Sequence, residues 1–181
     1  MNPLTRSSVT RSAIFTSFLF VTACSTPDPR WFTNEASERG IHFVHRSGYD
    51  GRPMMPEMVG SGAALADFNG DKLLDLYLVQ SGRVDKLLPP EQSANQLYLN
   101  KGGGQFEAVS AGAEDRGYGM GAAAADYDND GDVDLYVTNL GANVLLQNNG
   151  AGQFTDVTAA AGVGDPGWST AATFMDLDAD G

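Results

Sequence analysis

Short apolar runs alternate along the chain with turns rich in glycine, asparagine and aspartate. Two of these runs are nearly the same, "LDLYLVQ" at residues 74–80 and "VDLYVTN" at residues 133–139. Tyrosine and valine favour extended backbone, and turn residues bound each run, so both runs are predicted strands. The approach "GAAAAD" at residues 121–126 has helical propensity, but glycines precede it and an acidic turn ends it. We predict a strand there too.

These runs belong to an internal repeat. The stretch "NQLYLNKGGGQF" from Asn95 returns as "NVLLQNNGAGQF" 48 residues later, and "GSGAALADFNGDKLLDLYL" from Gly60 returns as "GMGAAAADYDNDGDVDLYV" 59 residues later. The 11 extra residues of the first copy indicate a loop insertion at 81–94. A third copy begins at Ser169, and residues 32–40 repeat the spacing of the segment that follows the second copy. Because the chain enters and leaves the repeat partway, we expect a fragment of a longer protein.

The length of the repeat predicts the fold. Units of about 40 to 50 residues with four short strands each are typical of β-propeller blades, which bury their faces against neighbouring blades. We therefore predict an all-β fold, a partial β-propeller of about two blades plus parts of flanking ones. A solenoid of parallel strands is the alternative, although its coils are usually much shorter.

The composition is that of a globular protein with an excess of acid. Hydrophobic residues make up 42% of the chain, and 23 Asp and Glu stand against 11 Lys and Arg, which gives a net charge of −12. Binding to a phosphate backbone needs a basic surface, so this charge argues against nucleic acid as a partner. A cationic partner or a metal ion suits the charge better.

The first 23 residues predict an export signal. They contain no acid and lead into the apolar run "AIFTSFLFVTA" at residues 13–23, which is shorter than the ~20 apolar residues of a membrane-spanning helix. Cys24 follows directly in "VTACS", which resembles a bacterial lipobox with Val21 in place of the usual leucine. An ordinary secretory signal that contains a cysteine is the alternative.

The lipobox resemblance implies lipidation of Cys24 and an exported outer-membrane lipoprotein, on its periplasmic or its cell-surface side. Contact with the membrane would then be made through the lipid anchor only. We expect a lipoprotein signal peptide at 1–23, a linker at 24–30 and the repeat region at 31–181.

Acidic turns recur at the same place in each copy. Calcium takes six to eight oxygen ligands, and a tight loop supplies them when acids alternate with spacers. The candidate ligands are oxygen donors at loop positions 1, 3, 5, 7 and 9. In loop one (residues 67–75) they are Asp67, Asn69, Asp71, the Leu73 carbonyl and Asp75; in loop two (residues 126–134) they are Asp126, Asp128, Asp130, the Asp132 carbonyl and Asp134; loop three opens with Asp176, Asp178 and Asp180.

The EF-hand begins in the same way but needs a glutamate at position 12 and flanking helices. Position 12 is Leu78 in loop one and Val137 in loop two, and both flanks are predicted strands, so the EF-hand is disfavoured. At position 6 Lys72 replaces the glycine of loop two, which costs about 1–2 kcal/mol if the left-handed backbone is kept. We predict weaker metal binding by loop one. A hydrophilic turn without metal is the alternative for both loops.

With "YGMGAAAADYDNDGDVDLYV" as the best copy, these loops resemble FG-GAP repeats, also called VCBS repeats, the calcium-bearing blades of integrin-alpha-type β-propellers. The lead-in at residues 40–82 is similar to bacterial proteins related to cartilage acidic protein, which end in an ASPIC/UnbV domain. The resemblance covers residues 31–181 and implies a seven-bladed propeller on the cell surface or in the periplasm. It also implies that the residues named above hold calcium, which shapes the loop and is not catalytic.

Two classes of function remain open. The first is a calcium-stabilised module on the cell envelope that binds an extracellular protein or glycan. The second is a propeller enzyme acting on an extracellular polysaccharide or another polymer, which would need paired carboxylates outside the metal loops. The acids available for such a pair are Glu57, Glu91, Glu107, Glu114 and Asp115, and no motif pairs them. We therefore expect a binding module and no enzymatic activity.

Overall fold

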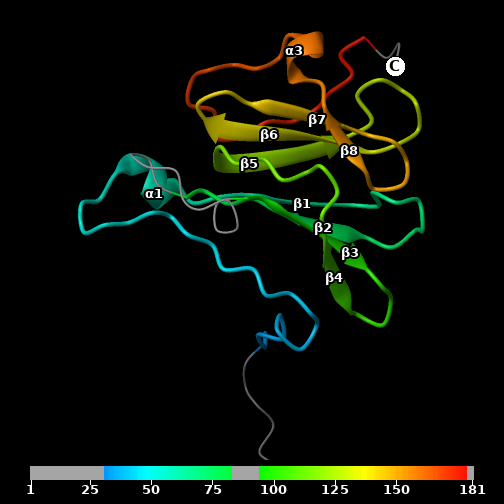
Figure 1. Ribbon diagram of the computed structural model, residues 1–181, viewed down its shortest axis with the longest axis horizontal. Coiled ribbons are helices and arrows are strands. Elements are labelled where there is room, and N and C mark those ends of the chain that lie inside the picture. Colours follow the sequence, from blue (N-terminus) through cyan, green and yellow to red (C-terminus); the bar gives the residue numbers. More distant parts are fainter. Residues whose placement is uncertain (1–30, 83–93, 179–181) are drawn as a thin grey trace, which may run out of the picture. The chain divides into compact units, whose positions relative to one another are not determined.

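The computed structural model describes residues 31–82 and 94–178, and the repeats lie in a compact unit that begins at Asn34. This unit contains two four-stranded antiparallel sheets, which confirms the predicted all-β fold (Figure 1). The first sheet is β1 (Ala63–Ala66), β2 (Asp75–Leu78), β3 (Gln96–Asn100) and β4 (Phe106–Val109). The second sheet is β5 (Tyr118–Ala125), β6 (Asp134–Leu140), β7 (Val144–Asn148) and β8 (Phe154–Asp156). Each strand pairs with the next along the chain, as in a propeller blade.

The alanine-rich approaches are strands, as predicted, and their small side chains have a packing reason. β1 and the second half of β5 carry them, and the chain runs close to itself where the start of β1 meets the middle of β5. A Cβ atom on Gly62 would lie 2.8 Å from the Cα atom of Gly121. Because real Cβ contacts are longer, only glycine allows this approach, and the alanines beside it keep the two strands close.

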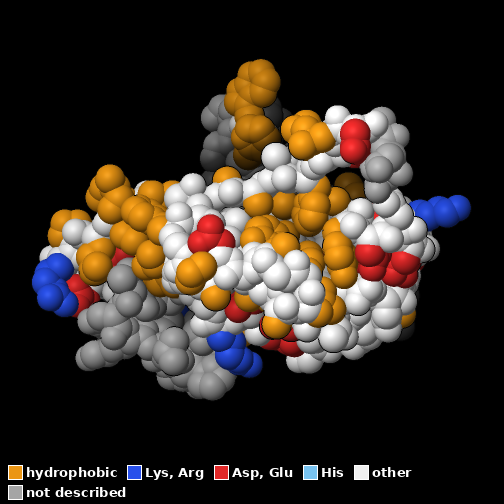
Figure 2. Space-filling view, turned by 90° about the horizontal axis from the view of Figure 1, so that it is seen from above, with side chains coloured by type: hydrophobic (Ala, Val, Ile, Leu, Met, Phe, Trp, Pro, Cys, Tyr) orange, Lys and Arg blue, Asp and Glu red, His pale blue; other side chains and the backbone are white. Residues whose placement is uncertain are grey.

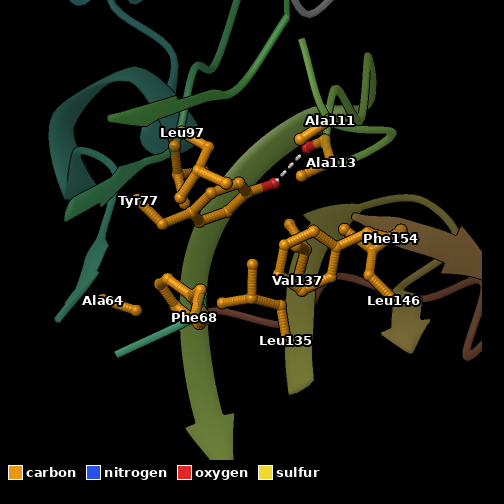
Figure 3. Packing of buried hydrophobic residues seen from close by; sticks show 11 residues of the cluster. Ala64, Phe68, Tyr77, Leu97, Ala111, Ala113, Leu135, Val137, Leu146 and Phe154 are labelled. Atoms are coloured by element: carbon orange, nitrogen blue, oxygen red, sulfur yellow. Dashed lines mark hydrogen bonds between the residues drawn. The ribbon is translucent and has the colours of Figure 1, made fainter. Parts of the chain in front are cut away.

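The hydrophobic core lies between the two sheets (Figure 3). Tyr77 and Leu97 come from the first sheet, whereas Leu135 and Val137 come from the second, and all four are at most 2% exposed. Tyr77 also donates a hydrogen bond from Oη to the Ala113 carbonyl at 2.8 Å, so its one polar atom is satisfied inside the core. The core therefore belongs to the pair of sheets and to neither sheet alone.

The connection after β4 joins the sheets through the backbone. The Phe154 amide donates a hydrogen bond to the Ala111 carbonyl at 2.7 Å. In the first sheet the Phe106 amide donates the corresponding bond to the Arg39 carbonyl at 2.8 Å. Gly112, the residue after Ala111, has a φ of +78°, and a Cβ atom there would overlap the Phe154 carbonyl oxygen. Arg39 and Gly40 therefore repeat this part of the connection, in agreement with the spacing found in the sequence.

The outer face of the second sheet repeats the buried surface of the first. Tyr136, the counterpart of Tyr77, donates from Oη to the Val163 carbonyl at 2.7 Å. This open face carries a cavity of about 440 Å³ that is open to solvent, and Figure 2 shows hydrophobic side chains gathered on the side of the molecule that carries it. Its lining residues are Tyr127, Tyr136, Leu145, Ala161, Val163, Ala172, Thr173 and Phe174.

Two short helices were not predicted from the sequence. They are α1 (Met55–Val59), before β1, and α3 (Thr158–Ala161), after β8. The described residues of the third copy, 169–178, form no strand, and one bridge joins Leu140 to Trp168 just before it. Among the described residues, no helix has the length and apolar character needed to cross a membrane. The predicted signal peptide, the linker and Cys24 lie outside the described residues.

Candidate functional site

Loop two, between β5 and β6, brings three carboxylates together. Asp126, Asp128 and Asp130 each offer an oxygen, and these oxygens lie within 4.8 Å of one another. Asp128 and Asp130 are exposed, and Asp126 is partly buried. The alternation seen in the sequence therefore does turn the side chains at positions 1, 3 and 5 to the same side of the loop.

The backbone of loop two is wrapped around its first carboxylate. Asp126 accepts hydrogen bonds from the amides of Asp130 at 3.2 Å and Gly131 at 2.9 Å. The turn needs two left-handed residues, and they are Asn129 with φ of +60° and Gly131 with φ of +96°. Asparagine and glycine are the residues that adopt this conformation most readily, so the local sequence favours the observed loop.

Position 9 has a different environment from positions 1, 3 and 5. Asp134 is fully buried, and its two oxygens accept the amides of Tyr127 at 3.0 Å and Asn148 at 2.7 Å. Burial raises the pKa of Asp134, and the two amide hydrogen bonds act in the opposite direction. This carboxylate therefore joins the start of loop two to the end of β7, and whether it also reaches a metal ion stays a prediction.

Loop one has the same backbone with fewer carboxylates. Asp67 accepts the amides of Gly70 at 2.8 Å, Asp71 at 3.1 Å and Lys72 at 2.7 Å. Lys72 has a φ of +69°, so loop one keeps the left-handed backbone on which the expected strain at this lysine depends. At position 3 the Asn69 Nδ2 donates to Asp71 Oδ2 at 3.1 Å, a contact made within the loop.

The remaining predicted ligands are placed as follows. Asp75 is fully buried and accepts the amides of Phe68 and Asn100 at 3.0 and 2.8 Å, and burial raises its pKa as it does for Asp134. Leu73 and Asp132 lie at position 7 of their loops, and each amide is held by the position-5 carboxylate, at 2.8 and 2.9 Å respectively. Asp176 and Asp178 are described, whereas Asp180 lies outside the described residues.

One contact to the candidate site was missed in the sequence. Gln147 lies on β7, and its Nε2 donates to Asp128 Oδ2 at 2.6 Å. In the first copy the same position holds Leu99, so a polar residue where the repeat is otherwise apolar was the available signal. The pairing of strands that brings Gln147 to the loop could not be read from that signal alone.

The donors of loop two fit calcium. Carboxylate oxygens are hard ligands, and hard divalent cations of this kind prefer them to nitrogen or sulfur. Three clustered carboxylates repel one another, and a bound cation would offset this repulsion. Asp126, Asp128 and Asp130 would hold the ion, with the Asp132 carbonyl and Asp134 as further candidates, and the ion would supply positive charge that fixes the loop.

The acids outside the loops are engaged in local contacts. Asp115 accepts the Gly117 amide and the Asn139 side chain, and the carboxylate of Glu114 accepts the Ala111 amide. Glu57 accepts the Met54 amide at the start of α1, and Glu107 lies 3.5 Å from Lys101. Glu91 lies outside the described residues.

Comparison with known proteins identifies the repeat. A family model described as "FG-GAP-like repeat" matches residues 67–137 and again residues 126–181. The two matches together span loops one, two and three and most of both sheets. No curated protein matches the chain.

Proposed function

Because the chain belongs to the FG-GAP-like repeat family, we propose that it is a calcium-binding module of β-propeller type, in which the ion stabilises the acidic loops. The family membership and the two four-stranded sheets establish a propeller-like module. The proposal adds a bound calcium ion to this module. It assigns the ion a structural role, with no step of catalysis.

The observation that carries the proposal is the cluster of Asp126, Asp128 and Asp130. Two carboxylates about 4 Å apart repel by roughly 4 kcal/mol at the effective dielectric of a protein surface. Backbone amides of the loop hold Asp126 and Asp130 in this arrangement, and the Gln147 side chain contacts Asp128. A loop that concentrates negative charge in this way is destabilised without a cation and stabilised with one.

We further propose an envelope location and an extracellular protein or glycan as the partner. The signal-like N-terminus, the lipobox-like Cys24 and the resemblance to bacterial ASPIC/UnbV-associated lipoproteins support this part of the proposal. Calcium is abundant outside cells, and extracellular calcium modules bind it with Kd values of about 10⁻⁴ to 10⁻³ M. A propeller module in that location can use bound calcium for rigidity.

Calorimetric titration of the 181-residue chain with calcium tests the proposal. We expect binding with a Kd of about 10⁻³ M or tighter and a higher Tm in calcium than in chelator. Asp130→Ala should weaken the binding at loop two at least tenfold, because it removes one of three clustered ligands. Glu107→Gln removes one negative charge outside the loops and should leave both readouts unchanged.

The proposal fails if the chain is folded, as judged by circular dichroism, and calcium produces neither heat nor a shift in Tm. It also fails if Glu107→Gln weakens calcium binding as much as Asp130→Ala does. That second result would mean that calcium responds to the net charge of −12 and not to the loop.

A further inference from the structure

The end of strand β7 forms hydrogen bonds to loop two. Gln147 Nε2 donates to Asp128 Oδ2 at 2.6 Å. The next residue continues the contact, because the Asn148 amide donates to Asp134 Oδ1 at 2.7 Å and its Nδ2 donates to the Val133 carbonyl at 3.0 Å. Positions 3, 8 and 9 of the loop are therefore all bonded to the end of one strand.

In the first sheet the end of β3 contacts loop one in the same way, but one of the contacts is missing. The Asn100 amide donates to Asp75 Oδ1 at 2.8 Å, and Asn100 Nδ2 donates to the Leu74 carbonyl at 3.0 Å, as Asn148 does to Asp134 and Val133. The residue before it is Leu99, which has no side-chain donor. Its loop partner at position 3 is Asn69, whose amide turns to Asp71 within the loop.

The two copies therefore differ at two matched positions, position 3 of the acidic loop and the strand residue before the asparagine that both copies share. The second copy has a carboxylate at position 3 and an amide donor on the strand that faces it, Asp128 with Gln147. The first copy has an amide at position 3 and an apolar side chain on the strand, Asn69 with Leu99. A carboxylate accepts hydrogen bonds and cannot donate one, so only the second copy needs and has an external donor.

We infer that Gln147 is a positioning residue for Asp128 and makes loop two the tighter of the two calcium loops. This inference rests on the proposed function. Asp128 is exposed, so its side chain is otherwise free to rotate, and binding an ion would cost the entropy of fixing it. The bond to one carboxylate oxygen fixes the side chain beforehand and leaves the other oxygen for the ion.

The expected size of the effect follows from metal sites in general. Residues that hydrogen-bond to metal ligands typically contribute 10- to 100-fold to metal affinity. Gln147 is itself partly exposed and contacts a single ligand. We therefore expect its contribution to metal affinity to lie at the lower end of that range. Lys72 acts in the same direction, because its positive charge lies in loop one, whereas the same position of loop two is Gly131.

Terbium, a luminescent ion that takes the same oxygen ligands as calcium, gives a readout that distinguishes loop two from loop one. Tyr127 stands inside loop two where loop one has Phe68, so tyrosine-sensitised terbium emission separates the second loop from the first. Gln147→Leu makes β7 match β3 and should weaken terbium binding about tenfold, with the same loss in calcium competition. Leu99→Gln, the reverse change in the first sheet, should leave this signal unchanged.

A double-mutant cycle separates positioning from general destabilisation. Asp128→Asn lowers the affinity by removing a ligand, and in that background Gln147→Leu should have less than a twofold further effect. Circular dichroism in chelator verifies that each variant is folded. The inference is overturned if Gln147→Leu changes the affinity of the folded chain less than twofold, or if its effect is the same with Asn at position 128.

The wild-type chain distinguishes failure of the inference from failure of the proposed function. Wild-type protein that is folded and gives no terbium emission and no calcium competition contradicts the proposed function, and the inference falls with it. Wild-type protein that binds, beside a Gln147→Leu variant that binds equally well, contradicts the inference alone.

Discussion

Asp75 and Asp134 occupy the last position of their acidic loops, and each is more deeply buried than any other carboxylate in its loop. Each accepts hydrogen bonds from two backbone amides. One belongs to the residue after the first aspartate of the loop, and the other to the last residue of the neighbouring strand, β3 or β7. Without the carboxylate, one buried and one partly buried amide would lose their acceptor, which is costly. This aspartate therefore belongs to the folded structure whether or not an ion is present.

Asp134→Ala should lower the free energy of unfolding by about 2–4 kcal/mol even in chelator, because it leaves one buried and one partly buried amide without an acceptor. Asp130→Ala serves as the matched control, since its carboxylate is exposed and should cost less than about 1 kcal/mol in chelator. Urea denaturation of both variants in excess chelator measures the difference.

An Asp134→Ala variant as stable as Asp130→Ala in chelator would contradict this assignment. The importance of Asp134 would then lie in metal binding alone. In that case the two variants should differ from the wild type only when calcium is added.

The residue-scale features of loop two were largely predictable. The alternation of Asp126, Asp128 and Asp130 predicted their clustering, because a tight turn leaves few ways to arrange side chains two positions apart. Comparison with Gly131 raised a left-handed Lys72 as a condition, and the structure shows that conformation. The contact of Gln147 with Asp128 did not follow, because it joins residues that are brought together by the pairing of β6 with β7.

At the scale of elements, the connection from β4 to β5 decides how the two sheets meet. Gly112 lies there with its Cα beside the Phe154 carbonyl, and a methyl group would overlap that oxygen. Gly162 occupies the corresponding place after β8, with a similar φ of +70°, and no atom lies within 4 Å of a Cβ atom built there. The two glycines therefore share a backbone shape and differ in what surrounds them.

Gly112→Ala should destabilise the protein more than Gly162→Ala. Both variants carry the cost of an alanine in the left-handed region, about 1 kcal/mol. Gly112→Ala also forces the Phe154 backbone away, which should add about 1–3 kcal/mol as overpacked sites do. Thermal and urea denaturation of the two variants, measured side by side, give the difference.

Equal destabilisation by the two substitutions would contradict a close approach at Gly112. It would mean that the second sheet can move away from the connection without loss of packing.

The strands were predictable as elements, whereas the helices were not. Runs such as "DLYL" combine strand propensity with sharp turn signals, and β2 and β6 form where these runs lie. The helix α3 has only 4 residues, too few for a periodic pattern. The third copy resembles a strand in sequence, but its described residues form no strand, and the one bridge beside it joins Leu140 to Trp168. A strand needs a neighbour along its length.

At the scale of the whole molecule, the two sheets depend on one shared core. Leu135 is fully buried on β6 and belongs to the same cluster as Phe68 and Tyr77 of the first copy. Phe68 also packs edge to face against Phe154, with ring centroids 5.7 Å apart. Neither sheet buries its inner face alone, so we expect the two sheets to unfold together.

Leu135→Ala should lower the free energy of unfolding by about 2–5 kcal/mol, because it leaves a cavity in the shared core. Leu65→Ala provides the control, since Leu65 is 61% exposed on β1 and should cost less than about 1 kcal/mol. Urea denaturation followed by circular dichroism should show one transition for the wild type and for both variants.

Two separate transitions, of which only one responds to Leu135→Ala, would contradict the shared core. The sheets would then be independent units that touch without depending on each other.

The open face of the second sheet sets the colloidal behaviour of this chain. Its apolar lining favours contact between molecules, whereas the net charge of −12 keeps them apart. Salt screens that repulsion over a Debye length of about 8 Å at physiological ionic strength, and cations bound in the loops would reduce the charge itself. Ionic strength and divalent cations should therefore act together in setting the concentration up to which the chain stays monodisperse.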